Sequence, residues 1–207
     1  MGRTQTFDTE RVVQAARDVF WDKGFEGTSL PDLELATGLS RSSLYNAFTS
    51  KRGLFDAAIE NYLDQVIRPR LSVLTAQPTP PDALHTYFSG LSRAIATLPD
   101  DSPRRGCLLL NSAGLASHDE ALRLVVDSYR AELGAAVEGA LRASNPGLDA
   151  VSVSTHGRLL TSLSVSALLV ARINKDEAVA ILATALDQIA AWASGHKPRS
   201  GAQPTNN

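Results

Sequence analysis

Apolar residues recur at helical spacing along most of the chain. In residues 7–24, Val12, Ala16 and Phe20 fall on one face of a helix, Asp8 can cap its start, and Gly24 can end it. Sustained alternation of polar and apolar residues, the pattern of a half-buried strand, is missing from the sequence. The pattern therefore predicts an all-α fold.

Serines divide the next part of the chain into short helices. Pro31 and Asp32 suit a first helical turn, where proline is tolerated and a carboxylate faces the positive end of the helix dipole. Three helices are expected, each after a serine that can cap it: residues 30–37 after Ser29, residues 41–48 after Ser40, and residues 51–66 after Ser50.

Prolines interrupt the helical pattern further along. Pro69 and the cluster Pro78, Pro80 and Pro81 predict a junction or hinge within residues 67–81. The helices expected beyond it span residues 81–98, 105–115, 119–143, 148–173 and 175–194. Residues 196–207 lack a large apolar side chain, and we expect this tail to be disordered.

Composition excludes several classes of protein. The chain has 207 residues, is 43% hydrophobic and carries a formal net charge of -2, so DNA binding would need a local concentration of positive charge. Neither a membrane span nor a signal peptide is evident, which predicts a cytoplasmic protein. The four histidines lie in separate segments, and nucleophile, phosphate-loop and dinucleotide motifs are not found. We expect no metal, no cofactor and no enzymatic activity.

One segment breaks the charge balance. Residues 35–55 contain Arg41, Lys51 and Arg52 but no acid, and they include the expected helix starts at Ser40 and Ser50. Helix N-termini carry free N–H groups and partial positive charge, which suit phosphate oxygens. The pattern predicts a face from which the acids have been withdrawn so that a polyanion can approach.

Two short helices joined by a glycine-containing turn are typical of a helix-turn-helix, whose second helix enters the major groove. There Arg41 can read guanine and Asn46 adenine. Alternatively, the serines only start the helix, Tyr45 is a half-buried packing ring and Lys51 is solvated. The predicted DNA-binding residues are Thr28, Ser29, Ser40, Arg41, Ser42, Ser43, Tyr45, Asn46 and Lys51.

The first third of the chain resembles the TetR family of bacterial transcriptional regulators. The residues that carry the resemblance are Ala15 to Phe20, Lys23 to Phe25, Thr28 and Ser29, Ala36 with Gly38 to Ser40, Leu44, Tyr45 and Phe48, and Ser50, Lys51 and Leu54. The resemblance implies a homodimer whose recognition helices meet double-stranded operator DNA about 34–36 Å apart. It also implies a repressor that a small organic effector releases.

The same resemblance divides the chain into an N-terminal three-helix DNA-binding domain, residues 1–53, and an α-helical ligand-binding and dimerisation domain, residues 54–195. It implies an effector pocket in the second domain, although Tyr87 and Phe88, with Leu91, are more typical of a core. The candidate pocket residues are Tyr62, Tyr87, Phe88, Leu91, Asn111, Tyr129 and Leu163.

The last two helices are the expected dimer interface. The resemblance implies this interface, and the last helix carries more apolar surface than one helix contact within a monomer requires, although an internal core for both helices remains the alternative. The predicted interface residues are Leu160, Leu168, Leu182, Leu186 and Ile189.

The single cysteine, Cys107, has two interpretations. In the first turn of a helix beside Arg104 and Arg105, its thiolate would be favoured, which would make the protein a thiol-switch regulator. A lone cysteine before a run of leucines that begins at Leu108 is more often a small buried residue, and thiols in apolar surroundings are inert. A third possibility, from another class of protein, is a helical small-molecule-binding or scaffold protein without DNA binding.

Overall fold

The computed structural model describes residues 8–195, and the predicted tail at residues 196–207 lies outside this range. Every regular element in the described part of the chain is a helix, which confirms the all-α fold. The elements are α1 (Thr9–Gly27), α2 (Leu30–Thr37), α3 (Arg41–Phe48), α4 (Lys51–Tyr62), a π-helical segment (Leu63–Ile67), α5 (Arg68–Thr75), α6 (Ala83–Thr97), α7 (Leu108–Asn111), α8 (Ala113–Ala116), α9 (Glu120–Ser144), α10 (Ala150–Val170) and α11 (Lys175–Gly195).

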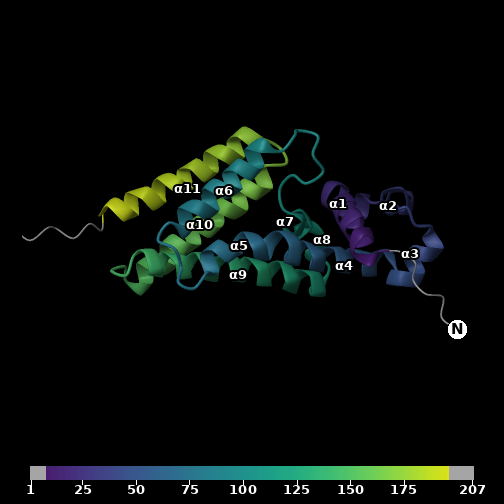
Figure 1. The fold of residues 1–207 in the computed structure, drawn as a ribbon, viewed down its shortest axis with the longest axis horizontal. Helices are drawn as coiled ribbons and strands as arrows, with labels where there is room; N and C mark the ends of the chain where they lie inside the picture. The colour runs from purple at the N-terminus through teal and green to yellow at the C-terminus, as the bar shows by residue number, and fades with distance from the viewer. Residues whose placement is uncertain (1–7, 196–207) are drawn as a thin grey trace, which may run out of the picture.

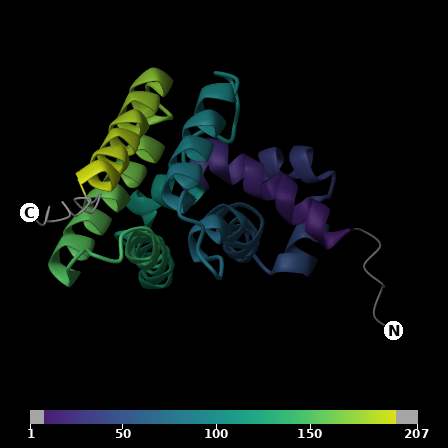
Figure 2. The ribbon, with the colours of Figure 1, turned by 60° about the vertical axis from the view of Figure 1, so that its left-hand side comes forward.

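The helices form an elongated molecule with a small head at one end (Figure 1). Helices α1 to α3 make the head, and α4 continues from it through the π-helical segment into α5. Helices α5 and α9 pack together along the molecule, and α11 packs against both α6 and α10 (Figures 1 and 2). The head is thus carried by a helical body several times its size.

Local capping explains where the first helix starts and stops. The Asp8 carboxylate accepts hydrogen bonds from the N–H groups of Glu10 and Arg11, at 3.0 and 3.2 Å. Gly24 interrupts α1 with φ 70° and ψ 172°, a backbone conformation that side chains disfavour. The predicted stop at Gly24 is therefore confirmed, although a short further helical turn follows it.

The junction expected at residues 67–81 is present, but it occupies only the last part of that range. Pro69 does not break the rod, because it occupies the first turn of α5, where a missing N–H costs little. The preceding π-helical segment, Leu63–Ile67, shifts the hydrogen-bond pattern just before the proline. The true break is between Thr75 and Ala83, where the remaining prolines lie.

An aromatic core joins the head to the body. The Phe20 ring of α1 lies edge-on to the Phe55 ring of α4, with centroids 5.1 Å apart, and both side chains are fully buried. Burying such a side chain stabilises the fold by about 1.5–3 kcal/mol. These contacts fix the first turns of α4 against α1. Among the described helices none is both long and apolar enough to cross a membrane.

Candidate DNA-binding site

The turn between α2 and α3 sets the direction of the candidate recognition helix. Gly38 ends α2 in the left-handed conformation, with φ 71°, and its N–H donates to the Glu34 carbonyl at 2.9 Å. Leu44 is buried beneath α3, so the opposite side of that helix faces solvent. This arrangement is the helix-turn-helix that the sequence predicts.

The exposed side of α3 carries Arg41, Ser42 and Asn46, whereas Ser43 and Tyr45 are half-buried. The Arg41 guanidinium lies over the Tyr45 ring, 5.4 Å from the ring centroid. Stacking on an aromatic face orients the guanidinium without neutralising it. Tyr45 is consequently both a packing ring and a support for Arg41.

The serines at the start of α3 bond to one another. Ser40 caps the helix by accepting from the Ser43 N–H at 3.4 Å, and its hydroxyl lies 3.0 Å from that of Ser42 and 3.1 Å from that of Ser43. These hydrogen bonds show that the three serines stabilise the start of α3. Their contact with DNA stays a prediction.

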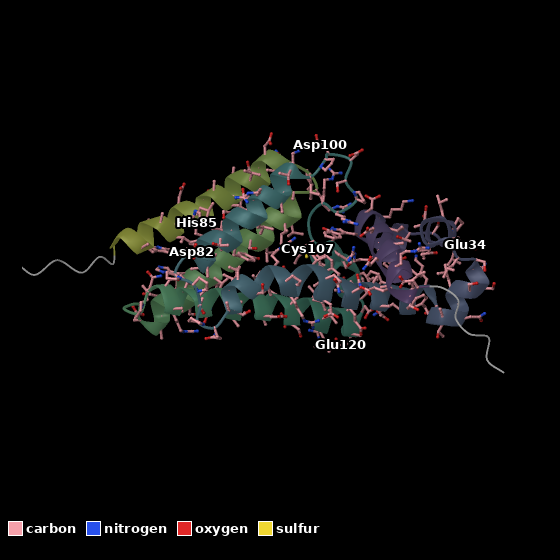
Figure 3. All side chains as sticks on the ribbon, in the orientation of Figure 1. Glu34, Asp82, His85, Asp100, Cys107 and Glu120 are labelled. Atoms are coloured by element: carbon pink, nitrogen blue, oxygen red, sulfur yellow. The ribbon has the colours of Figure 1, made fainter. Side chains whose placement is uncertain are left out.

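Glu34 corrects the expected absence of acids near this face. Although Glu34 precedes the acid-free segment, its carboxylate accepts a hydrogen bond from the Arg41 N–H at 2.5 Å (Figure 3). The fold brings this side chain back across the α2–α3 turn, so the start of α3 already holds an anionic group. Arg52 also differs from the expectation, because it pairs with Asp56 and Asp119. Arg41 and Lys51 are the cations of this segment without a carboxylate partner in the described residues.

Thr28 is the clearest correction among the predicted DNA contacts. Its side chain is 2% exposed, and its hydroxyl donates to the Gly24 carbonyl at 2.6 Å, so it closes the end of α1 and faces away from solvent. Ser29 is exposed, and it forms a capping box with Asp32. Hydrogen bonds from Lys23 and Ser29 hold the pKa of the Asp32 carboxyl well below its usual range. Thr28 therefore closes α1, and Ser29 starts α2.

The start of α4 is placed by a close approach that sequence analysis missed. Ser50 caps α4 by accepting from the Gly53 N–H at 3.0 Å. A Cβ atom at Gly53 would lie 2.2 Å from the Phe48 carbonyl oxygen, so only glycine lets α4 approach the end of α3 so closely. Lys51 lies beside this junction with its ammonium group 4.5 Å from the Phe25 ring centroid. A glycine in the first turn of a helix was the signal available in the sequence. That it faces the Phe48 carbonyl oxygen is known only from the fold.

Cys107 lies in the body of the molecule and is fully buried (Figure 3). It precedes the four-residue helix α7 in an extended conformation, and so it is not in the first turn of a long helix as expected. Burial raises the pKa of the thiol, although contacts with Tyr62 and the start of α7 act in the opposite direction. The structure thus favours the buried, inert interpretation.

The candidate pocket residues lie in the core of the body. Five of them are buried: Tyr62, Tyr87, Phe88, Leu91 and Tyr129. Leu163 and Asn111 are half-buried. A surface groove of about 650 Å³ lies elsewhere, between α9 and α10, lined by Gly134, Gly157 and Thr161 among others. None of the seven candidate pocket residues is among the residues that line this groove.

Three of the predicted dimer residues pack inside the single chain. Leu160, Leu168 and Leu182 are at most 2% exposed, which corrects their assignment to a contact surface. Leu160 and Leu168 belong to α10, which lies between α9 and α11, and Leu182 belongs to α11, which packs against α6 and α10. Leu186 and Ile189 are half-buried.

The fold and the exposed face of α3 define a helix-turn-helix protein of the class that regulates transcription. The model for "Bacterial regulatory proteins, tetR family" matches residues 12–58. The chain is 31% identical to the uncharacterized HTH-type transcriptional regulator YezE of Bacillus subtilis, over 85% of this chain and 92% of that protein. The chain belongs to the TetR family of bacterial transcriptional regulators.

Other relatives agree with this assignment. The HTH-type transcriptional repressor ComR of Escherichia coli is 33% identical over 57% of this chain and 55% of ComR. A solved structure of a cysteine mutant of the TetR family regulator CifR, complexed with a 26-bp double-strand operator DNA, superimposes with a TM-score of 0.72. It is 27% identical and covers 90% of this chain and 98% of CifR. The class of scaffold proteins without DNA binding is therefore disfavoured.

Proposed function

We propose that the protein is a homodimeric repressor that binds double-stranded operator DNA in the cytoplasm and is released by a small organic effector. The observation that carries this proposal is the outward face of α3, where Arg41 is held over Tyr45 and remains unpaired with any carboxylate in the described residues. Residues 1–53 bind DNA, and residues 54–195 bind the effector and the second subunit.

Within α3 the side chains divide by the kind of contact that they make. Arg41 has the fork of donors that matches the acceptors of guanine, and Asn46 can pair with adenine through its amide. Ser42 and Ser43 donate to phosphates or bases once their hydrogen bonds with the Ser40 hydroxyl exchange. Lys51, at the start of α4, binds a phosphate and fixes the orientation of the head.

The surface of α10 and α11 supports a dimer through these helices. Leu159 and Leu169 of α10 are 41% and 44% exposed, respectively. The exposed side of α11 presents Ala180, Ala183 and Ala191, which let another helix approach closely. Asp187 is the charged residue between Ala183 and Ala191 on this face, and a face that is otherwise made of small apolar side chains is better covered than solvated. Leu186 and Ile189, which are half-buried residues of α11, complete the proposed interface.

The buried core of the body supports an effector site. The Tyr62 hydroxyl is buried without a well-formed hydrogen bond, and the thiol of Cys107 lies beside it. A buried polar group left unpaired costs about 1–3 kcal/mol, so a ligand that pairs with it is favoured. Tyr62 also ends α4, the helix whose other end carries Lys51. Effector binding would therefore act on the DNA-binding head through α4, by favouring one of two head arrangements.

In vitro selection from randomised duplex DNA tests the proposal. We expect enrichment of a sequence with two-fold symmetry, bound by two chains, with half-sites about 10 bp apart or a multiple of that spacing. Asn46→Ala should lose affinity for the selected site, whereas Asn61→Ala, on the side of α4 that binds α1, should retain the base preference. The proposal is overturned if no sequence is enriched above random DNA.

A further inference from the structure

The end of α1 is held by a residue far away in the sequence. A helix leaves its last carbonyl groups without partners inside the helix, and these groups form the negative end of its dipole. Arg172, in the turn between α10 and α11, donates from Nη1 to the Trp21 carbonyl at 2.8 Å and from Nη2 to the Asp22 carbonyl at 2.7 Å. One guanidinium therefore binds two consecutive carbonyls of the head.

The Arg172 side chain is itself positioned by close packing. Gly106 has φ 75°, and a Cβ atom there would lie 2.7 Å from the Leu168 carbonyl oxygen and 3.1 Å from Cγ of Arg172. The backbone before α7 is thus pressed against both α10 and the stem of Arg172. This packing leaves the guanidinium little freedom to move away from α1.

Further contacts hold the same end of α1 to the segment before α7. The Trp21 indole N–H donates to the Arg105 carbonyl at 3.0 Å, and Arg104 pairs with Asp18 at 2.6 Å. The Trp21 ring also meets the Tyr62 ring edge-on, with centroids 4.8 Å apart. The head is consequently attached to the body through α1 as well as through the continuous helix α4.

We propose that Arg172 is a positioning residue that couples the subunit interface to the orientation of the DNA-binding head. A head joined to the body through α4 alone can swing about it, whereas a second attachment removes that freedom. Because Arg172 lies in the turn between α10 and α11, a shift of these helices against the partner subunit moves the end of α1 with them. This inference rests on the proposed operator-binding dimer.

The test compares Arg172→Ala and Arg172→Lys with the control Arg142→Ala, which removes a surface arginine paired with Glu138 on α9. A spin label at Glu10→Cys, an exposed position on α1, is placed in a Cys107→Ala background. Pulsed electron resonance measures the distance distribution between the two heads of the dimer. Operator affinity, affinity for a single half-site and thermal stability are measured on the same proteins.

We expect Arg172→Ala to broaden the distance distribution and to weaken operator binding by about tenfold, within the range typical of coupling between sites. Half-site affinity should stay unchanged, because each head keeps its own DNA contacts. The distance distribution and operator affinity of Arg172→Lys should lie between those of Arg172→Ala and wild type, since an ammonium lacks the planar fork of a guanidinium. If Arg172→Ala does not fold, Arg172→Lys provides the test. A merely structural role would lower thermal stability but leave the distances of the folded protein unchanged, and that result overturns the inference.

Failure of the proposed function has a different signature. If the wild-type protein does not bind operator DNA, or gives no measurable distance between two spin labels, the proposal of an operator-binding dimer is contradicted. The attachment of α1 is not. In that case hydrogen exchange of residues 18–23 tests the attachment directly. Exchange in this segment must rise in Arg172→Ala and not in Arg142→Ala, and equal exchange in both contradicts the role of Arg172.

Discussion

The carboxylate of Glu34 accepts a hydrogen bond from the backbone N–H of Arg41 at 2.5 Å, at the start of the helix proposed to enter the major groove. The N-terminus of that helix is also where a phosphate would find partial positive charge. The carboxylate therefore satisfies an N–H group in the free protein and repels the phosphate backbone when DNA approaches.

Replacing Glu34 by Gln should strengthen DNA binding, because it keeps a hydrogen-bond acceptor but removes the charge. A charge near a helix end contributes about 0.3–1 kcal/mol, so the expected gain is about two- to fivefold at low salt. Fluorescence anisotropy at several salt concentrations measures it, with Glu132→Gln on α9 as an equal change of charge away from the head. Equal affinities for the two variants would show that Glu34 does not oppose DNA.

Gly53→Ala should damage the junction of α3 and α4. The added Cβ would lie 2.2 Å from the Phe48 carbonyl oxygen, a backbone atom that cannot rotate away. Overpacking of this kind costs about 1–3 kcal/mol in the free energy of unfolding, which urea titration measures. The matched control is Gly90→Ala in α6, where a Cβ meets no atom within 4 Å and the change should stabilise by about 0.5–1 kcal/mol. A gain of stability in both variants would contradict the close approach of Gly53 to the Phe48 carbonyl oxygen.

Ala183→Arg should separate the subunits. Ala183 is exposed on α11 in the single chain, but the proposed dimer buries it against the partner. A long charged side chain keeps two helices from approaching closely, and burying a charge costs several kcal/mol even with Asp187 four residues away, so the dimer should weaken by more than about a hundredfold. Sedimentation velocity gives the dissociation constant. Ala143→Arg, near the end of α9, should stay dimeric, and a dimeric Ala183→Arg would move the interface away from this face.

The protein should lose stability at alkaline pH. Burial raises the pKa values of Tyr62, Tyr87 and Tyr129 above the ordinary value of 10.0, and that of Cys107 above 9.0. The folded state therefore keeps protons that the unfolded state releases. Their contribution is fully present below pH 9 and is lost as the pH rises through the folded pKa values, at up to about 1.4 kcal/mol per group and pH unit.

Urea titrations from pH 7 to pH 11 measure this loss. Tyr62→Phe should be at least as stable as wild type at neutral pH, because it removes a buried hydroxyl without a well-formed hydrogen bond. It should also decline less steeply above pH 9. Tyr45→Phe, on the head, is the control for the loss of a phenol. A wild-type stability that does not change above pH 9 would contradict the buried environment of these side chains.

Most of the head could be predicted from the sequence because local interactions determine it. Ser29, Ser40 and Ser50 cap the three helices that they are expected to start, and Gly24 and Gly38 adopt a positive φ at the kink of α1 and at the end of α2. Each of these signals acts over a few residues. Local sequence therefore suffices to place α1 to α4.

The errors concern contacts between distant residues. The sequence predicts an acid-free face and an exposed Thr28, but the turns fold the Glu34 and Thr28 side chains back onto the head. It places Leu160 at a dimer surface, but α10 is covered on two sides. Pro69 was read as a break, but a π-helical segment places it in a first turn. The contact between Arg172 and α1 spans about 150 residues and has no sequence pattern. Only the assembled fold reveals these relationships.

The most direct test of the central claim is a salt-resolved titration of the wild-type protein, Lys51→Met and Arg41→Ala on the DNA upstream of its own gene. Phosphate contacts predict that log affinity falls with log salt concentration by about 0.9 per phosphate neutralised. Lys51→Met should reduce this slope by about one on every sequence, and Arg41→Ala should relax the preference for operator over random DNA. A slope near zero for the wild-type protein, with equal affinity for both DNAs, would contradict an operator-binding repressor.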